Sequence, residues 1–178
     1  MTFVSIQRQL LPIEHQQLRH HIPEINRLGD LGIKWRRLGE AGTTLLERGE
    51  HQRATEMDGS LLVDVNPATF VTTLEDLPTV ESARERLMAK IIDVTFLGSN
   101  RFLSIAYMLD SEVLEQERQQ YTDAIDAANS IASPWRRYEP YLSIATVERF
   151  GASEEVLQAF YDISPEEVTL LPVVVKNS

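Results

Sequence analysis

The chain has 178 residues, no cysteine, and a formal net charge of −10 that comes from 27 acidic and 17 basic residues. The absence of cysteine excludes disulfides, thiolate metal sites, iron–sulfur clusters and a cysteine nucleophile. The acidic excess argues against a surface that coats duplex nucleic acid or an anionic membrane, and the length and the 43% hydrophobic content are typical of a single globular domain over residues 1–178.

The N-terminal third predicts several strands and one helix. Apolar residues recur at helical spacing over about 12–28, after Pro12, a residue that suits the first turn of a helix. The polar stretch 49–59 is typical of a loop. Strands are expected, in chain order, over 3–6, 33–38, 43–47 and 60–65.

The rest of the chain alternates in the same way. A helix is expected from Thr79 to about Lys90, because its apolar residues fall on one helical face. The elements expected after it are a hairpin of 92–97 and 102–109, a long helix from Asp110 or Ser111 to about Ile131, a strand over 141–147, a short helix after Ser153, and a strand over 168–175. Interleaved helices and strands with hairpin-like connections predict an α+β fold with a mixed or mainly antiparallel sheet.

The chain contains an internal similarity that keeps its order. Its only two tryptophans, Trp35 and Trp135, are both followed by Arg-Arg. Two flanking pairs match in the same order, Phe3-Val4-Ser5-Ile6 with Phe102-Leu103-Ser104-Ile105 and Glu47-Arg48 with Glu148-Arg149. The pattern predicts a duplicated β-α-β unit, with halves of about 1–66 and 92–178 joined by a helix-containing segment, 67–91. We expect the two halves to share one sheet about a pseudo-twofold axis, with a central groove.

The second copy carries a family resemblance. The run Tyr138-Glu139-Pro140-Tyr141-Leu142-Ser143-Ile144-Ala145 resembles the second signature of the two-histidine phosphoesterase superfamily, which includes 2′-5′ RNA ligase-like proteins and cyclic phosphodiesterases. In the first copy, Ile33–Arg36 and Gly39–Leu46 resemble the stretch that leads into the first signature. The resemblance implies a duplicated, bilobal α+β fold with a cleft in which two histidines act as general acid and base on a phosphodiester.

The chain departs from that family at both histidines. Their positions are occupied by Ala41 or Gly42 and by Tyr141, and an alternative placement of the first motif, Ser60–Val63, also lacks histidine. Proton transfer at neutral pH needs a group whose pKa lies near 7, which alanine and glycine do not have and which tyrosine, with a pKa of about 10, does not provide. We therefore predict no catalytic residue and lean against an enzyme.

The hydroxyl partners of the family motif persist, and arginines accompany them. Each Arg-Arg pair would place at most one guanidinium in the groove, because neighbouring residues of a strand point to opposite faces; the other reading of these arginines is pairing with local acids. The predicted ligand-binding residues are Arg36, Arg37, Thr43, Thr44, Arg136, Arg137, Tyr141 and Ser143.

Other kinds of site are not indicated. The spacing of His15 from His20 and His21 does not place two imidazoles on one helical face, so no metal or cofactor is expected. Aromatic residues make up 7% and form no basic–aromatic stripe, which argues against a stacking platform for RNA. No apolar run approaches the roughly 20 residues that cross a bilayer, and the first residues lack the hydrophobic stretch of a signal peptide, so a cytoplasmic location without membrane contact is expected.

Three functions remain open. The first is a catalytically degenerate phosphoesterase-like protein whose groove binds a nucleotide, an RNA end or a protein partner. The second is a structural or assembly scaffold, for example a viral or oligomeric component, with no small-molecule ligand. The third is an active phosphodiesterase that uses other residues. Converging groove side chains favour ligand binding, whereas a groove filled by Trp35, Trp135 and apolar residues favours the scaffold.

Overall fold

The structure is a computed structural model that describes residues 3–21, 32–49, 52–56, 59–63, 73–98, 101–128 and 139–177. Its strands are β1 (Phe3–Gln9), β2 (Lys34–Trp35), β3 (Gly42–Gly49), β4 (Gln52–Glu56), β5 (Gly59–Val63), β6 (Leu87–Leu97), β7 (Phe102–Asp110), β8 (Tyr141–Glu148), β9 (Glu167–Leu170) and β10 (Val174–Asn177). Its helices are α1 (Pro12–Arg19), α3 (Glu112–Ala128) and α4 (Glu154–Asp162), with short 3-10 turns η2 (Leu74–Asp76), η3 (Glu81–Arg84) and η4 (Arg149–Gly151).

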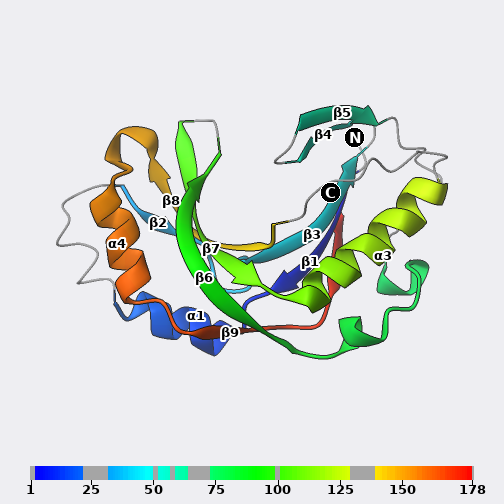
Figure 1. The fold of residues 1–178 in the computed structure, drawn as a ribbon, viewed down its shortest axis with the longest axis horizontal. Coiled ribbons are helices and arrows are strands. Elements are labelled where there is room, and N and C mark those ends of the chain that lie inside the picture. Colours follow the sequence, from blue (N-terminus) through cyan, green and yellow to red (C-terminus); the bar gives the residue numbers. More distant parts are fainter. Residues whose placement is uncertain are drawn as a thin grey trace.

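One curled sheet organises these elements. Its eight strands follow the order β10-β1-β3-β8-β7-β6-β9, with β2 paired to β8 off this path, and β4 and β5 form a separate hairpin. Every strand pair formed by the described residues is antiparallel. Figure 1 shows the sheet as a half-barrel, with β6 and β7 forming one wall and β3 and β1 the other, and α3 and α4 at opposite ends. The α+β class and the antiparallel sheet are confirmed.

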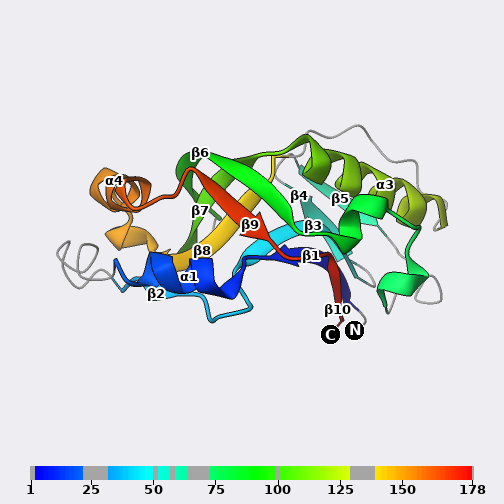
Figure 2. The same cartoon turned by 90° about the horizontal axis from the view of Figure 1, so that it is seen from below.

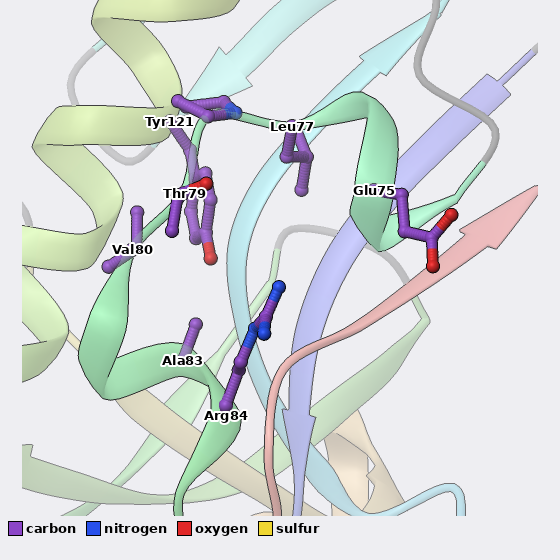
Figure 3. Close-up of a pocket in the computed structure, with 8 residues that line it drawn as sticks. Glu75, Leu77, Thr79, Val80, Ala83, Arg84 and Tyr121 are labelled. Carbon is purple, nitrogen blue, oxygen red and sulfur yellow. The ribbon is translucent and has the colours of Figure 1, made fainter.

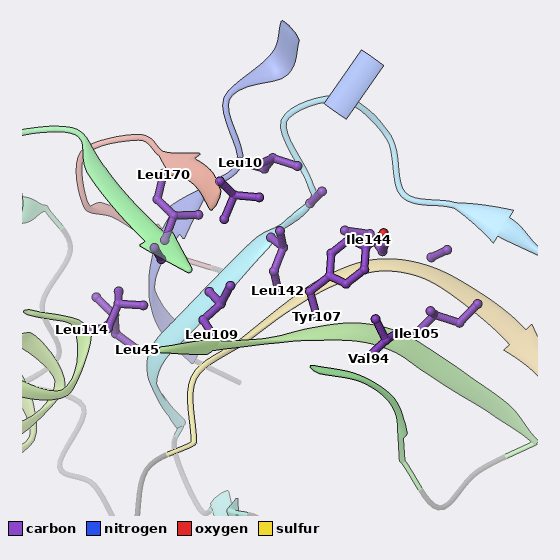
Figure 4. Packing of buried hydrophobic residues seen from close by; sticks show 14 of the residues in the cluster. Leu10, Leu45, Val94, Ile105, Tyr107, Leu109, Leu114, Leu142, Ile144 and Leu170 are labelled. Carbon is purple, nitrogen blue, oxygen red and sulfur yellow. The ribbon is translucent and has the colours of Figure 1, made fainter. Parts of the chain in front are cut away.

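The hydrophobic core lies on one face of this sheet. The odd-numbered residues Leu103, Ile105, Tyr107 and Leu109 of β7 are buried, whereas Ser104 between them is only partly buried. This alternation is the period of two that a pleated strand imposes. Figure 4 shows how the β7 side chains meet those of the neighbouring strand β8, such as Leu142 and Ile144. Polar residues such as Ser104 lie on the other face of the sheet.

The helices are fastened to this core by both apolar and polar contacts. Pro12 is at the first position of α1, as its fixed φ favours, and Ser153 caps α4 by accepting a hydrogen bond from the Val156 backbone N–H. The Tyr107 hydroxyl donates to the Phe160 carbonyl over 2.8 Å, which anchors α4 to the back of the sheet. Seen from below, in Figure 2, α1 lies in front of the sheet near its edge strand β9, and the first strand β1 lies beside the last strand β10.

Several elements differ from the sequence-based expectation. The helix predicted from Thr79 to Lys90 is wrong: only η3 is helical there, and β6 already begins at Leu87. The apolar residues Leu87, Ala89 and Ile91 fit an alternating pattern as well as a helical one, and pairing with β7 and β9 selects the strand. The predicted loop 49–59 is also wrong, since it contains β4, which pairs with β5.

Smaller corrections concern the ends of elements. The strand predicted over 168–175 is two strands, β9 and β10, which pair with β6 and β1 respectively. The strand predicted over 33–38 reduces to the two residues of β2. The first predicted helix is present as α1, and the part of it beyond His21 lies outside the described residues. None of the described helices is long and apolar enough to cross a membrane.

Candidate functional site

A pocket of about 360 Å³ lies on the face of the sheet that is turned away from the core. It forms where β3 and β8 meet, with β1 and β7 on either side and the segment after β2 above them. The β3–β8 contact pairs Gly42 with Ser143, so the two predicted motifs face each other at this point. The pocket is lined by Gln7, Arg36, Glu40, Gly42, Thr44, Leu97, Gly98, Ser104, Tyr141 and Ser143.

Hydrogen bonds hold the polar side chains of this pocket together. The Arg36 Nε donates to the Ser143 Oγ over 3.0 Å, and the hydroxyls of Ser143 and Ser104 form a short hydrogen bond with each other. The Arg36 backbone N–H also donates to the Ile144 carbonyl over 2.9 Å. Arg36 is thus fixed to β8 through its main chain and its side chain, which places a guanidinium beside two hydroxyls.

Four of the eight predicted residues line the pocket, namely Arg36, Thr44, Tyr141 and Ser143. Arg37 is exposed and does not line it. Thr43 is 1% exposed on the core side of β3, because successive strand residues point to opposite faces. Arg136 and Arg137 lie outside the described residues, as does Trp135.

The two positions that the resemblance aligns with the family's first histidine, Ala41 and Gly42, leave no room for a larger side chain in the pocket, for two different reasons. Ala41 is 1% exposed and belongs to the core, so it does not face the pocket. Gly42 does line the pocket, but a Cβ at this residue would lie 2.6 Å from the Arg8 carbonyl oxygen of β1. Any side chain at position 42 would therefore require β1 to move. The alternative motif, Ser60–Val63, lies in the separate hairpin of β4 and β5.

Sequence reasoning missed other residues of the pocket. Ser104 sits on β7 and was visible only as the repeated serine of the Phe-x-Ser-Ile strands. The Gln7 Nε2 donates to the Ser5 Oγ over 2.7 Å, on the strand that carries the other copy of that serine. Glu40 also lines the pocket, and its negative carboxylate partly offsets the positive charge of Arg36 there. Glu40 lies within the motif stretch Gly39–Leu46, but nothing in the sequence assigned Glu40 or Gln7 a role in binding.

A basic–aromatic cluster lies at the end of β7 that leads toward the pocket. It consists of two Arg-Phe dipeptides, Arg101-Phe102 and Arg149-Phe150, and the Arg149 backbone N–H donates to the Arg101 carbonyl over 2.7 Å. The phenylalanine side chains are 45% and 82% exposed. The Arg101 guanidinium lies 5.5 Å from the Phe102 ring centre and 3.1 Å from the Glu148 carboxylate.

This cluster was not anticipated, because the sequence shows no basic–aromatic stripe. The two dipeptides are far apart in the sequence, and only the pairing of Phe102 with Glu148 between β7 and β8 brings them together. Phe102 is two residues from Ser104 and therefore lies on the same face of β7 as this residue of the pocket. Among the described residues, no group of three His, Asp or Glu side chains could hold a metal ion.

Comparison with known proteins finds similarity in the fold but not in the sequence. No family model matches the sequence, and no curated protein matches it. The chain is similar to the solved structure of Usb1 from Kluyveromyces marxianus, with a TM-score of 0.52 and 10% sequence identity over 98% of this chain and 93% of that chain. At this identity the likeness concerns the fold alone.

Proposed function

We propose that this chain is a phosphoesterase-like protein that lacks acid–base catalysis and binds the phosphate-bearing end of a nucleotide or an RNA strand in the pocket at β3 and β8. The observation that carries the proposal is the convergence of Arg36, Ser143 and Ser104 where no histidine lines the pocket. The likeness to Usb1, which suggests an RNA-processing phosphoesterase-like fold, supports the same substrate class.

The chemistry of the pocket suits a phosphate oxygen. An arginine guanidinium presents five N–H donors in a planar fork that matches phosphate. The Nε of Arg36 is used by Ser143, and its Nη atoms make no hydrogen bond with the other described residues. The hydroxyls of Ser104 and Ser143 share one hydrogen bond, so one of their two O–H groups is left as a further donor. Glu40 at the pocket wall favours a ligand with few charges, such as a single terminal phosphodiester, over a highly charged one.

The basic–aromatic cluster favours binding of a single RNA strand over binding of a duplex. Exposed aromatic rings stack on unpaired bases, and arginines beside them contact the backbone. Phe102 lies on the β7 face that leads to Ser104, so a base could stack there while its neighbouring phosphate enters the pocket. The acidic surface of the molecule as a whole remains unsuited to coating a duplex.

The groups present support the proposed loss of catalysis. Tyr141 is the ionisable side chain at one motif position, and a phenol is a poor base at neutral pH. Gly42 at the other position transfers no proton, and its backbone has no room for a side chain. We propose that binding was retained while hydrolysis was lost.

A scaffold role has less support. It requires a groove filled by tryptophan and apolar side chains, but Trp35 packs against Phe160 with ring centres 5.5 Å apart and does not line the pocket. The pocket is lined mainly by polar side chains. The predicted duplication, its axis and the division into two halves remain proposals; the neighbouring strands β1-β3 and β8-β7 are compatible with them.

Binding is tested by fluorescence anisotropy with short labelled oligoribonucleotides that end in a 3′-phosphate, a 2′,3′-cyclic phosphate or a 3′-hydroxyl. Charge-assisted hydrogen bonds contribute about 1.5–3 kcal/mol, so Arg36→Gln should weaken binding of the phosphorylated ends about tenfold or more. Arg86→Gln, an exposed arginine away from the pocket, is the matched control and should bind normally. Equal affinity for all three ends would contradict a phosphate site.

Catalysis is tested on the same 2′,3′-cyclic substrate. We expect no turnover above the uncatalysed rate, because no histidine lines the pocket. Turnover that disappears in Ser143→Ala or Tyr141→Phe would show that the protein is an enzyme. That result would be compatible with the proposed phosphate site and would contradict only the proposed loss of catalysis.

A further inference from the structure

A second cavity, of about 210 Å³, lies between α3 and the segment that contains η2 and η3. It shares no lining residue with the pocket at β3 and β8, so the two sites are independent. Its walls include the apolar side chains of Leu77, Val80 and Ala83, which are almost fully buried. Figure 3 shows two polar side chains, Tyr121 of α3 and Arg84 of η3, that point into the cavity from different sides.

Tyr121 has a hydroxyl that the described part of the chain leaves without a partner. The side chain is fully buried and its oxygen accepts and donates no hydrogen bond there. The neighbouring buried groups are already satisfied by one another: Arg8 donates to both carboxylate oxygens of Glu117, over 2.8 and 2.6 Å, and the Ser82 hydroxyl donates to Glu117 over 2.7 Å. A buried hydroxyl without a partner is unfavourable, so an acceptor inside the cavity would stabilise it.

Arg84 supplies the charge on the opposite side of the same space. Its guanidinium reaches into the cavity, and it forms no ion pair with the other described residues. Burial, with the nearby Glu117 carboxylate, raises the pKa of Tyr121 to about 12, so the phenol stays protonated and can donate at neutral pH. A phenol and a guanidinium that face one space are both donors, and together they fit an acceptor with negative charge.

We infer that this cavity binds a small monocarboxylate, with the carboxylate held between Arg84 and Tyr121 and a short apolar group against Leu77, Val80 and Ala83. The volume is several times the roughly 30 Å³ that a liquid water occupies, and it suits an acid with a few carbon atoms. The apolar walls and the Glu75 carboxylate at the rim disfavour phosphate and other multiply charged anions.

A carboxylate of this kind has two sources, a free short-chain acid or the C-terminus of a peptide that ends in a small apolar residue. Isothermal titration calorimetry of the full chain with isobutyrate, with the peptide Ala-Ala-Val, and with the amide of that peptide separates them. Saturable binding of isobutyrate supports the site and identifies a free acid as the source. Binding of the peptide with a free carboxylate, but not of the peptide amide, supports the site and identifies a peptide C-terminus as the source. No binding of either acid, or equal binding of the peptide amide, overturns it.

Two variants test the assigned residues. Arg84→Gln should weaken binding about tenfold or more, whereas Arg86→Gln, two residues away and not part of the cavity lining, should bind normally. Tyr121→Phe should weaken binding in the same direction, while the melting temperature of the free variant stays equal to that of the wild type or rises, because a buried hydroxyl without a partner is removed. A free Tyr121→Phe protein that melts lower, with ligand binding unchanged, would show that the hydroxyl is structural and would overturn the inference.

Discussion

His15 is a buried polar side chain without hydrogen-bond partners among the described residues. It is 1% exposed, and its ring lies beside Trp35, with centroids 6.3 Å apart. Burial lowers the pKa of His15 from its ordinary value of 6.5, and the positive charge of Arg19 lowers it further. The folded protein therefore holds a neutral imidazole and resists its protonation.

Stability should consequently fall on mild acidification. The unfolded chain takes up a proton on His15 near pH 6.5 and the folded chain only at lower pH, so the free energy of unfolding is unaffected above pH 7 and decreases as the pH falls below 6.5. Thermal melts from pH 8 to pH 5 should show a smaller loss in His15→Leu than in the wild type. His20→Gln, an exposed histidine one turn further along, should keep the wild-type slope; an unchanged slope in His15→Leu would contradict this reading.

At the scale of elements, the approach of β1 to β3 decides what the pocket can contain. The register of these strands shifts between Ile6 and Gln7, and β1 then passes so close to Gly42 that an added Cβ would lie 2.6 Å from the Arg8 carbonyl oxygen. Position 42 requires a glycine because the atoms that an added Cβ would meet belong to the backbone of β1. A flexible side chain could move aside at little cost, but a strand backbone cannot. The absence of histidine at this position is therefore built into the packing of two strands.

Gly42→Ala should lower stability by about 1–3 kcal/mol, the range observed when a packed site is overfilled. Gly42→Val should lower it further, as read from urea denaturation. For the same reason, the double change Gly42→His with Tyr141→His should not create cyclic phosphodiesterase activity. A Gly42→Ala protein as stable as the wild type, or activity in the double variant, would show that β1 moves aside easily.

At the scale of the whole molecule, one buried ion pair and the hydrogen bonds of its arginine join five parts of the chain. Arg8 of β1 pairs with Glu117 of α3 and also donates to the carbonyls of Ser82, Glu85 and Leu171, over 2.8, 2.8 and 3.1 Å. These carbonyls belong to η3, to the segment before β6 and to the link between β9 and β10. The guanidinium thus connects the N-terminal strand to segments far along the chain.

Glu117→Leu should destabilise the protein by about 3–5 kcal/mol, because it leaves a buried guanidinium without its counter-charge. The double variant Arg8→Met with Glu117→Leu should recover much of that loss, since no uncompensated charge remains. Glu148→Gln breaks the exposed pair with Arg101 and should cost less than about 1 kcal/mol. Equal losses in the buried and exposed pairs, measured by denaturant unfolding, would contradict the role of Arg8.

Part of the fold and of the site was readable from local patterns. The alternation in 102–109 and 141–147 predicted β7 and β8 closely, and the motif around Tyr141 and Ser143 predicted two residues that line the pocket. The segment 79–90 was misread because its apolar residues fit two periods, and only the partner strands β7 and β9 decide between them. Glu40 lies within Gly39–Leu46 and Gln7 follows the repeated run Phe3–Ile6, but neither pattern indicated that these two side chains line a pocket.

The sequence by itself determined which chemical groups this protein has to use: hydroxyls at positions 44 and 143, a phenol at 141, paired arginines, and no histidine in either motif. Tertiary structure alone decided which of them meet. It brought Arg36 to Ser143 across 107 residues, placed two distant Arg-Phe dipeptides side by side, turned Thr43 into the core, and aimed Tyr121 and Arg84 into one cavity. The reason is physical: periodicity along a segment reports which face is buried, whereas strand register and helix packing set what lies opposite that face.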